Sequence, residues 1–143
     1  MKEESGQMRL RPIEERDLET VRLLRNRARE WFFDTEAITA AAHRAWFESL
    51  GERAVVFYVI ELDERVVGTI SVTSYDGERE IGNVLMEDAY QGRGIMSRAL
   101  AEILNEPGRY YARVKPNNSA SLRLFEEAGF ERRHVYLDRD IPV

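Results

Sequence analysis

Residues 90–100, Tyr-Gln-Gly-Arg-Gly-Ile-Met-Ser-Arg-Ala-Leu, combine a glycine-spaced turn with the start of an amphipathic helix. The first-turn amides of a helix have no backbone partner, and the helix dipole adds about half a positive charge, so an anion is stabilised there. Gly92 and Gly94 allow positive φ and a close approach to phosphate oxygens. The segment therefore predicts a pyrophosphate site. An ordinary tight turn before a helix has the same spacing, and the third glycine of a dinucleotide motif is missing.

The elements that precede this turn are a strand, two helices and three strands. We expect a strand over residues 8–11, a helix over 15–29, and a second helix that begins at Thr39 and closes at Gly51 in a left-handed conformation. Runs rich in Val, Ile, Tyr and Thr predict antiparallel strands over 54–62, 65–75 and 80–86.

The elements that follow the turn predict a change in strand direction. The helix from Ile95 ends at Pro107 and Gly108, a strand covers 109–115, and a helix lying between two strands of one sheet implies a parallel crossover. Asn118 caps a last helix that ends at Gly129 with Phe130 packed on Phe125, and a strand over 131–138 completes the sheet. We expect one α/β domain over 1–143, residues 1–7 being disordered. Its mixed sheet has about six strands, antiparallel and then parallel, and four flanking helices.

Composition restricts the function. With 143 residues and 43% hydrophobic content, the chain suits one domain with a real core. A net charge of −5 argues against a nucleic-acid partner, and the longest apolar run, over 54–60, is too short to span a membrane. The chain has no cysteine, which excludes disulfides, thiolate-rich metal sites and a cysteine nucleophile. We expect a cytoplasmic protein without a metal, as a monomer or homodimer.

Two signatures in this order of elements resemble the GNAT superfamily of acyl-CoA N-acyltransferases. The first is the Gln-x-x-Gly-x-Gly/Ala turn into a helix, matched by Gln91 to Gly94. The second is the last helix, matched by Asn118, Ser121, Leu124, Glu126, Gly129 and Phe130. The resemblance covers nearly the whole chain and implies the GNAT fold, with acetyl-CoA as the co-substrate.

The resemblance also implies how the coenzyme is bound. Backbone groups of Val84, Leu85 and Met86 would pair with the pantetheine arm, and the Val84 amide would polarise the thioester carbonyl. The Asn118 side chain would bond the arm, although a plain helix cap explains it equally well. The pyrophosphate would lie on the turn formed by Gln91, Gly92, Arg93, Gly94, Ile95, Met96 and Ser97.

Catalysis requires a neutral amine, because an ammonium has no lone pair. The resemblance implies Glu80 as the base, at the position of the catalytic glutamate of the histone-acetylating branch; a solvated carboxylate paired with Arg79 or a neighbour is the alternative. Where members acting on ribosomal-protein N-termini can use a glutamate, this chain has Arg113, which counts against such a substrate.

The sequence departs from the family pattern at two positions. Met96 replaces a small residue, and Phe125 replaces the tyrosine that protonates the departing thiolate. Another donor would serve, or the thiolate leaves unprotonated. The possible donors are Tyr110, Tyr111, Ser121 and a water.

Acceptor choice in the superfamily depends mainly on the first two helices and their connection. That region is similar to members that acetylate amino sugars, including nucleotide-linked ones, through Arg25, Asn26, Trp31, His43 and Trp46. Aromatic faces would stack on a sugar or base, and His43 could bond a hydroxyl. Core packing of Trp46 and a structural histidine are the alternatives. Three functions stay open: acetylation of a small-molecule amine, acetylation of a protein or peptide amine, and non-catalytic acyl-CoA binding.

Overall fold

The computed structural model describes residues 7–134, 137 and 139–142. Nine helices and strands lie within these residues, joined in places by short 3-10 turns. They are β1 (Met8–Pro12), α1 (Leu18–Arg27), α2 (Ala40–Ser49), β2 (Val55–Leu62), β3 (Arg65–Tyr75), β4 (Glu78–Met86), α3 (Ile95–Ile103), β5 (Tyr110–Ala112) and α4 (Ser119–Glu127).

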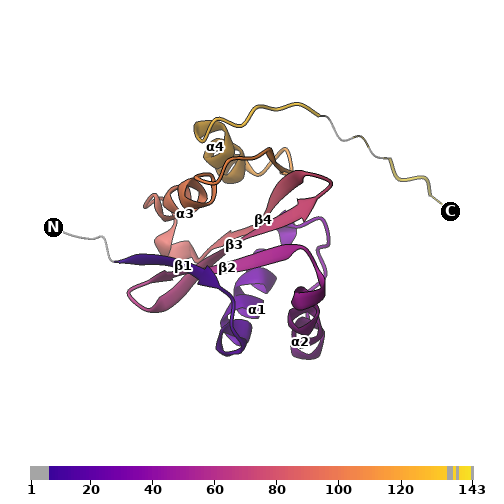
Figure 1. Cartoon of the computed structure of the whole chain (residues 1–143). Helices are drawn as coiled ribbons and strands as arrows, with labels where there is room; N and C mark the ends of the chain where they lie inside the picture. The colour runs from indigo at the N-terminus through magenta and orange to yellow at the C-terminus, as the bar shows by residue number, and fades with distance from the viewer. Residues whose placement is uncertain (1–6, 135–136, 138, 143) are drawn as a thin grey trace.

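The strands form one sheet in the order β1-β2-β3-β4-β5. The first three pairings are antiparallel, and β4 pairs with β5 in parallel. Helices α1 and α2 cover one face, and α3 and α4 cover the other (Figure 1). This is the mixed α/β architecture with four helices that the sequence predicts.

Apolar packing holds both layers to the sheet. On the α3 and α4 side, Ile70 and Ile81 pack with Ala99, Leu100 and the ring of Phe125. On the opposite side, Val21 of α1 packs with Phe57 and Val59 of β2, and Trp46 of α2 lies against this cluster. Helices α1 and α3 therefore bury the apolar faces that their three- and four-residue spacing predicts, whereas α2 buries His43 and leaves Ala42 exposed.

A buried ion cluster fastens β1 to β2 and to the start of α1. The Arg11 guanidinium donates to both carboxylate oxygens of Asp17, at 2.8 and 2.9 Å, and lies 3.0 Å from a Glu61 oxygen. Burial raises the pKa of Asp17, but the hydrogen bonds from Arg11 and from the Glu14 amide outweigh it, so the pKa lies below its ordinary value.

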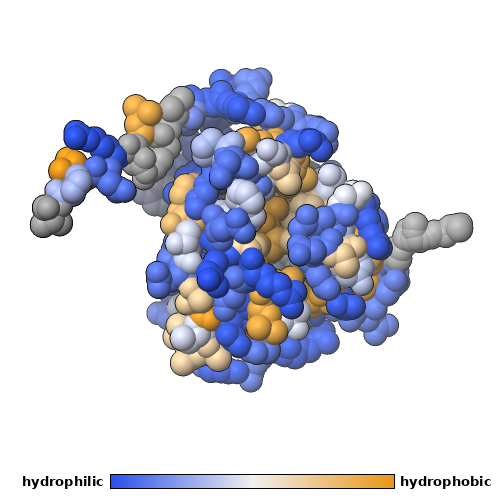
Figure 2. Space-filling model, turned by 180° about the vertical axis from the view of Figure 1, so that it is seen from behind, coloured by the Kyte–Doolittle hydropathy of each residue, from blue (hydrophilic) through white to orange (hydrophobic). Residues whose placement is uncertain are grey.

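Seen from behind, the molecular surface is mostly hydrophilic, with separate hydrophobic patches (Figure 2).

The sheet has five strands among the described residues, not the expected six. The four described residues at the start of the expected strand, 131–134, are Glu-Arg-Arg-His and lie in no strand. They offer no apolar side chain to bury on a sheet. Residues 135, 136 and 138 lie outside the described residues, as do residues 1–6 of the expected disordered start. Gln7 exchanges two hydrogen bonds with Asp63.

Three boundaries also differ from prediction. The first helix begins as a 3-10 turn at Glu15–Asp17 and ends at Arg27. Gly51 is not left-handed, because the chain leaves α2 through a second 3-10 turn, Leu50–Glu52. Strand β5 is shorter than the expected 109–115, because β4 pairs with it only as far as Ile81.

Candidate active site

The turn before α3 is shaped to receive an anion. Gly92 and Gly94 have φ of 77° and 75°, and a Cβ placed on either would meet nothing within 4 Å. The first helical hydrogen bond runs from the Arg98 amide to the Gly94 carbonyl, at 3.1 Å. The amides of Ile95, Met96 and Ser97 therefore lack partners within the helix. These exposed donors fit the pyrophosphate that the sequence predicts here.

The flanking side chains of this turn fold back onto the protein. Gln91 donates to the Met86 carbonyl at 3.2 Å and to Asp88 at 3.3 Å. The Arg93 guanidinium lies 5.1 Å from the centre of the Tyr90 ring. Side-chain packing thus fixes the turn, while its backbone amides stay open.

The second half of β4 has one unpaired edge. Parallel pairing with β5 ends at Ile81, whereas antiparallel pairing with β3 continues to Met86. The Glu87 amide donates to Val67 of β3, and successive backbone groups of a strand alternate in direction. The backbone groups of Val84 and Met86 therefore face the open edge, and Leu85 directs its carbonyl toward Gly68.

A β-bulge at Asn83 creates this change. The register with β3 shifts between Thr69 and Ser71, so that one extra residue of β4 is accommodated, and Asn83 has φ of 51°. The Thr69 hydroxyl donates to the backbone carbonyl of Asn83 at 2.6 Å. The side-chain amide of Asn83 donates to the Ser71 hydroxyl at 2.9 Å. Since Thr69 and Ser71 are buried, the bulge is held by the core and fixes the direction of the Val84 amide.

Glu80 is ion-paired with Arg113, the residue that follows β5. Arg113 Nε donates to Glu80 Oε2 at 2.7 Å, and the Tyr111 hydroxyl lies 3.5 Å from Oε1. The hydrogen bond to Glu80 raises the pKa of Arg113, and burial with the neighbouring Glu80 charge raises the pKa of Tyr111. The alternative role for Glu80 was a carboxylate paired with Arg79, but Arg79 is ion-paired with Glu106, at 2.7 Å. The carboxylate has a strong counterion and remains accessible, with 21% of its side chain exposed.

The predicted acceptor residues do not all line one surface. His43 is 3% exposed and stacks on Trp46 with ring centres 4.8 Å apart, and Trp46 meets Phe57 edge to face at 4.9 Å. Burial, and then the charges of Arg25 and Arg22, lower the pKa of His43. Both rings therefore belong mainly to the packing of α2 on the sheet.

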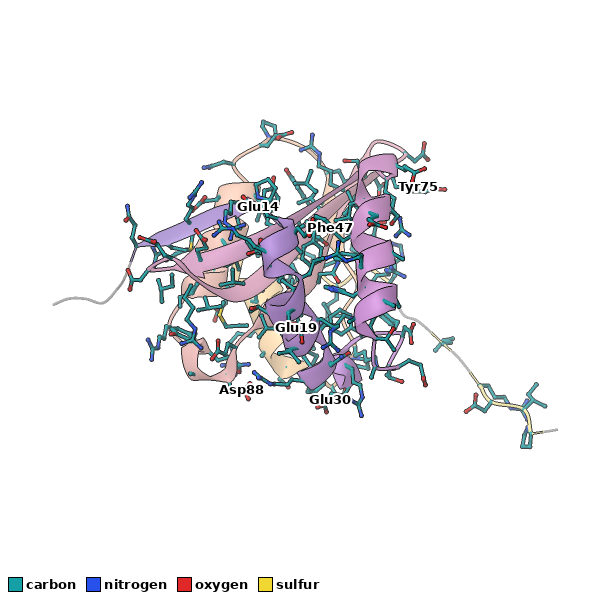
Figure 3. The ribbon with its side chains drawn as sticks, turned by 90° about the horizontal axis from the view of Figure 1, so that it is seen from below. Glu14, Glu19, Glu30, Phe47, Tyr75 and Asp88 are labelled. Carbon is teal, nitrogen blue, oxygen red and sulfur yellow. The ribbon has the colours of Figure 1, made fainter. Side chains whose placement is uncertain are left out.

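The other three residues lie where α1 runs into the loop toward α2. In Figure 3, α1 and α2 lie in front of the sheet, and Glu30 marks where the chain leaves α1. Asn26 exchanges two hydrogen bonds with the backbone of Ile38, at 2.8 and 3.0 Å. Arg25 lies over the Phe32 ring at 4.4 Å, and Trp31 is 39% exposed. Asn26 thus shapes the loop, while Trp31 presents a face to solvent.

Two expectations about α4 are confirmed in their structural part. Asn118 Oδ1 accepts the Ser121 amide at 3.2 Å, so it caps the helix. Phe125 is buried and meets Phe130 edge to face at 5.1 Å, beside a left-handed Gly129. The coenzyme contact of Asn118 stays a prediction.

The two tyrosines considered as proton donors for the thiolate differ in the hydrogen bonds that their hydroxyl groups already make. The Tyr110 hydroxyl donates to the Glu106 carbonyl at 2.8 Å and accepts from Arg79 at 2.9 Å. Its proton is therefore engaged in joining β5 to the end of α3. Tyr111 lies on the Glu80 side and keeps its proton at neutral pH, since its pKa is raised.

Sequence reasoning missed two residues of the site. It treated Arg113 only as a missing glutamate, although strand alternation places Tyr111 and Arg113 on the same face as Glu80. It treated Asn83 as an ordinary strand residue. Asparagine tolerates positive φ, and its place beside Gly82 was the available signal for a bulge.

Open depressions elsewhere are shallow. One of about 670 Å³ is lined by Leu23, Asn26, Arg27, Arg29 and Glu30, so it borders one predicted acceptor residue, Asn26. Within the described part of the chain, no helix is both long and apolar enough to cross a membrane. The same residues contain no group of three His, Cys, Asp or Glu arranged to hold a metal ion.

Comparison with known proteins identifies the family. The family model described as an acetyltransferase (GNAT) domain matches residues 7–131. A segment of 57 residues is 40% identical to the N-alpha-acetyltransferase RimI of Mycobacterium tuberculosis, covering 38% of this chain and 36% of that protein. The chain thus spans about a third or less of the length of the curated relatives it matches.

Solved structures agree with the family match over most of the chain. A domain from Methanocaldococcus jannaschii superposes with a TM-score of 0.81 at 26% identity, covering 90% of this chain and 91% of that one. The enzyme AAC(6')-Ib, solved with ribostamycin and coenzyme A, has a TM-score of 0.74 at 28% identity, covering 88% of this chain and 84% of its own. With the fold, the open turn before α3 and the family match in agreement, the chain belongs to the GNAT acetyltransferase family.

Proposed function

We propose that this protein transfers the acetyl group of acetyl-CoA to a primary amine of a small molecule, by direct attack in a ternary complex. The observation that carries the proposal is the combination of open amides before α3 with an unpaired edge at Val84 of β4. One feature suits a pyrophosphate, and the other suits an extended arm with a carbonyl at its end.

The chain's own groups account for coenzyme binding. The turn over 91–97 offers amide donors to the pyrophosphate, and the open backbone groups of Val84 suit the pantetheine arm. Met86 offers its amide only, because its carbonyl accepts from Gln91. Leu85 would not contact the arm directly, because its carbonyl faces Gly68 and its side chain is buried. Asn118 uses Oδ1 for the cap, and the nitrogen of the same amide is the group we assign to the arm.

Acetyl-CoA supplies an activated thioester when bound, and the protein supplies a base and an oxyanion donor. Glu80 accepts the proton that the acceptor ammonium must lose, and the amine nitrogen then forms a bond to the acetyl carbon. The Val84 amide donates to the carbonyl oxygen as charge develops on it. The nitrogen then loses its second proton to water, the carbon–sulfur bond breaks, and the sulfur leaves as a thiolate near an apolar Phe125. No acyl-enzyme forms.

For the acceptor, we infer a position beside the loop between α1 and α2, with Arg25, Asn26, Trp31, His43 and Trp46 around it. The exposed ring of Trp31 supports stacking on a sugar or base. His43 and Trp46 would act from beneath, through the shape of the loop. An amino sugar, free or nucleotide-linked, is the finer form of this proposal. AAC(6')-Ib, 28% identical, was solved with the aminoglycoside ribostamycin.

A protein or peptide amine is the second candidate. It is favoured by the 57-residue similarity to RimI, an N-alpha-acetyltransferase. The pairing of Arg113 with Glu80 weighs against it, because a peptide amine is followed by a neutral amide, which gives the guanidinium no negatively charged partner in place of Glu80.

The coenzyme part is tested by calorimetry on two matched variants. Gly94 and Gly77 both have positive φ, 75° and 81°, with open space where a Cβ would stand. Gly94→Arg strains the turn and obstructs the amides, so coenzyme A affinity should fall at least about tenfold. Gly77→Arg carries the same backbone strain in the β3–β4 turn and should bind normally. Equal affinity of both variants contradicts the proposed site.

The transfer is tested by release of free thiol from acetyl-CoA across a panel of amines. The panel contains amino sugars, amino acids, polyamines and short peptides. Thiol release with a small molecule supports the proposal, and release with peptides alone supports the second candidate. Tight coenzyme binding with no thiol release from any amine would establish a non-catalytic acyl-CoA-binding module.

A further inference from the structure

The chain at and after β5 sends alternate side chains to opposite faces of the sheet. Tyr110, Ala112 and Val114 pack against the core under α3 and α4. Tyr111, Arg113 and Lys115 reach the opposite side, where their partners lie. The first two contact Glu80, and Lys115 Nζ donates to the Glu30 carbonyl at 2.9 Å. Two cations thus lie on the same face as the proposed base.

Three cationic side chains converge on the loop formed by residues 30–33. Arg25 lies over Phe32 at 4.4 Å, Arg113 over Phe33 at 5.4 Å, and Lys115 bonds the backbone of residue 30. A guanidinium that rests its face on a ring keeps N–H donors at its edge. Among the described residues, buried Arg25 Nε has no hydrogen-bond partner. Three cations therefore lie around this loop, together with the carboxylates of Glu30 in the loop and of Glu80 beside Arg113.

The Glu80–Arg113 ion pair can open so that another cation takes the place of Arg113 at Glu80. Its 2.7 Å contact is short, but 65% of the Arg113 side chain is exposed, so water can solvate the guanidinium when the pair opens. An acceptor ammonium must approach Glu80 to lose its proton, and in doing so it takes the partner of Arg113. If the acceptor carries a carboxylate or phosphate next to its amine, that anion can form a new ion pair with the Arg113 guanidinium.

We propose that Arg113 selects acceptors in which a carboxylate or phosphate stands close to the reacting amine, as in an amino acid or a phosphorylated amino alcohol. The inference rests on the proposed function, since it assigns the acceptor ammonium to Glu80. Arg113 is then a specificity-determining residue.

The experiment compares acceptors that share an amine and differ in the anion. Alanine, phenylalanine and methionine are each paired with their carboxamides, and phosphoethanolamine is paired with ethanolamine. For the wild type, Arg113→Gln and Arg113→Lys, kcat/KM is measured for both members of each pair. In Arg113→Gln the preference for the anionic member should fall about fivefold, mainly through KM, and Arg113→Lys should retain part of it. Differences in amine basicity cancel when the preferences of two proteins are divided.

Arg109→Gln is the matched control. Arg109 lies just before β5, is 62% exposed and pairs loosely with Glu78 at 3.7 Å, away from Glu80. This variant should keep the wild-type preference. A wild type that does not favour the anionic member of any pair, or an equal loss for both members in Arg113→Gln, overturns the inference alone. Coenzyme binding without thiol release from any amine overturns the proposed function as well.

Discussion

Glu80 occupies a position where structure and chemistry make different demands. Its contact with Arg113 holds the carboxylate in the sheet, and the same contact must yield when an amine arrives. A buried ion pair would resist such an exchange, whereas this pair is partly exposed. The ion pair therefore fixes the position of the Glu80 side chain while leaving its carboxylate accessible to solvent. A base that takes a proton from an external substrate needs both properties.

Glu80→Gln tests this role. The amide cannot accept the ammonium proton, so kcat at neutral pH should fall about 100-fold while acetyl-CoA affinity stays unchanged. Steady-state thiol release and calorimetry measure the two quantities. Glu78→Gln is the control, because Glu78 lies on the same strand and is ion-paired with Arg109. Unchanged turnover in Glu80→Gln would remove Glu80 from the mechanism.

Strand β4 serves two purposes along its length. Its first residues pair on both sides, and its second half, beyond the bulge at Asn83, pairs on one side only. The bulge lies on buried hydroxyls of β3, so the open edge is a built feature of the sheet. A straight strand would have continued pairing with β5 and left no place for an extended arm.

Substitutions at Asn83 should separate the bulge from overall folding. Asn83→Val places a β-branched residue at φ of 51° and should cost about 1–2 kcal/mol of unfolding free energy. It should also lower kcat, because the Val84 amide loses its direction. Asn83→Gly keeps the conformation and loses only the bond to Ser71, so its kcat should stay closer to wild type. Denaturant unfolding and thiol release measure both; a higher kcat in Asn83→Val than in Asn83→Gly would refute the assigned role.

At the scale of the whole molecule, two buried groups make the fold sensitive to acid. The pKa of His43 is lowered by burial, so the unfolded chain binds a proton below about pH 6.5 that the folded protein excludes. The pKa of Asp17 is lowered by Arg11, so its stabilisation is present above its unfolded pKa near 4 and is lost as pH falls further. Both effects reduce the free energy of unfolding as pH decreases.

The melting temperature should therefore fall between about pH 7.5 and 5.5, before the carboxylates titrate. His43→Gln should be less stable throughout, since it loses the stacking on Trp46, but its melting temperature should change less over this interval. His134, which is exposed, provides the control: His134→Gln should keep the wild-type slope. Thermal melts at constant ionic strength measure both, and equal slopes for wild type and His43→Gln would exclude this origin.

The glycine-spaced turn, the caps at Thr39 and Asn118 and the direction of the sheet followed from residue types and spacing, whereas the left-handed end expected at Gly51 was wrong. Glycine at 92 and 94, asparagine at 118 and the pattern Gly129-Phe130 each specify local backbone, and local backbone depends on neighbours in sequence. The prediction of a sixth strand was wrong over residues 131–134, because these four polar residues cannot supply an apolar face.

The sequence by itself determined the family, the order of the described elements and the glycine-spaced turn before α3, because these depend on short-range pattern. Only the tertiary structure decided that His43 and Trp46 pack between α2 and the sheet, and that Arg113 is the partner of Glu80. Residues 80 and 113 are brought together by the parallel pairing of β4 and β5. A contact between distant segments is set by sheet register and by where pairing stops, and neither is encoded in the immediate neighbours of either residue.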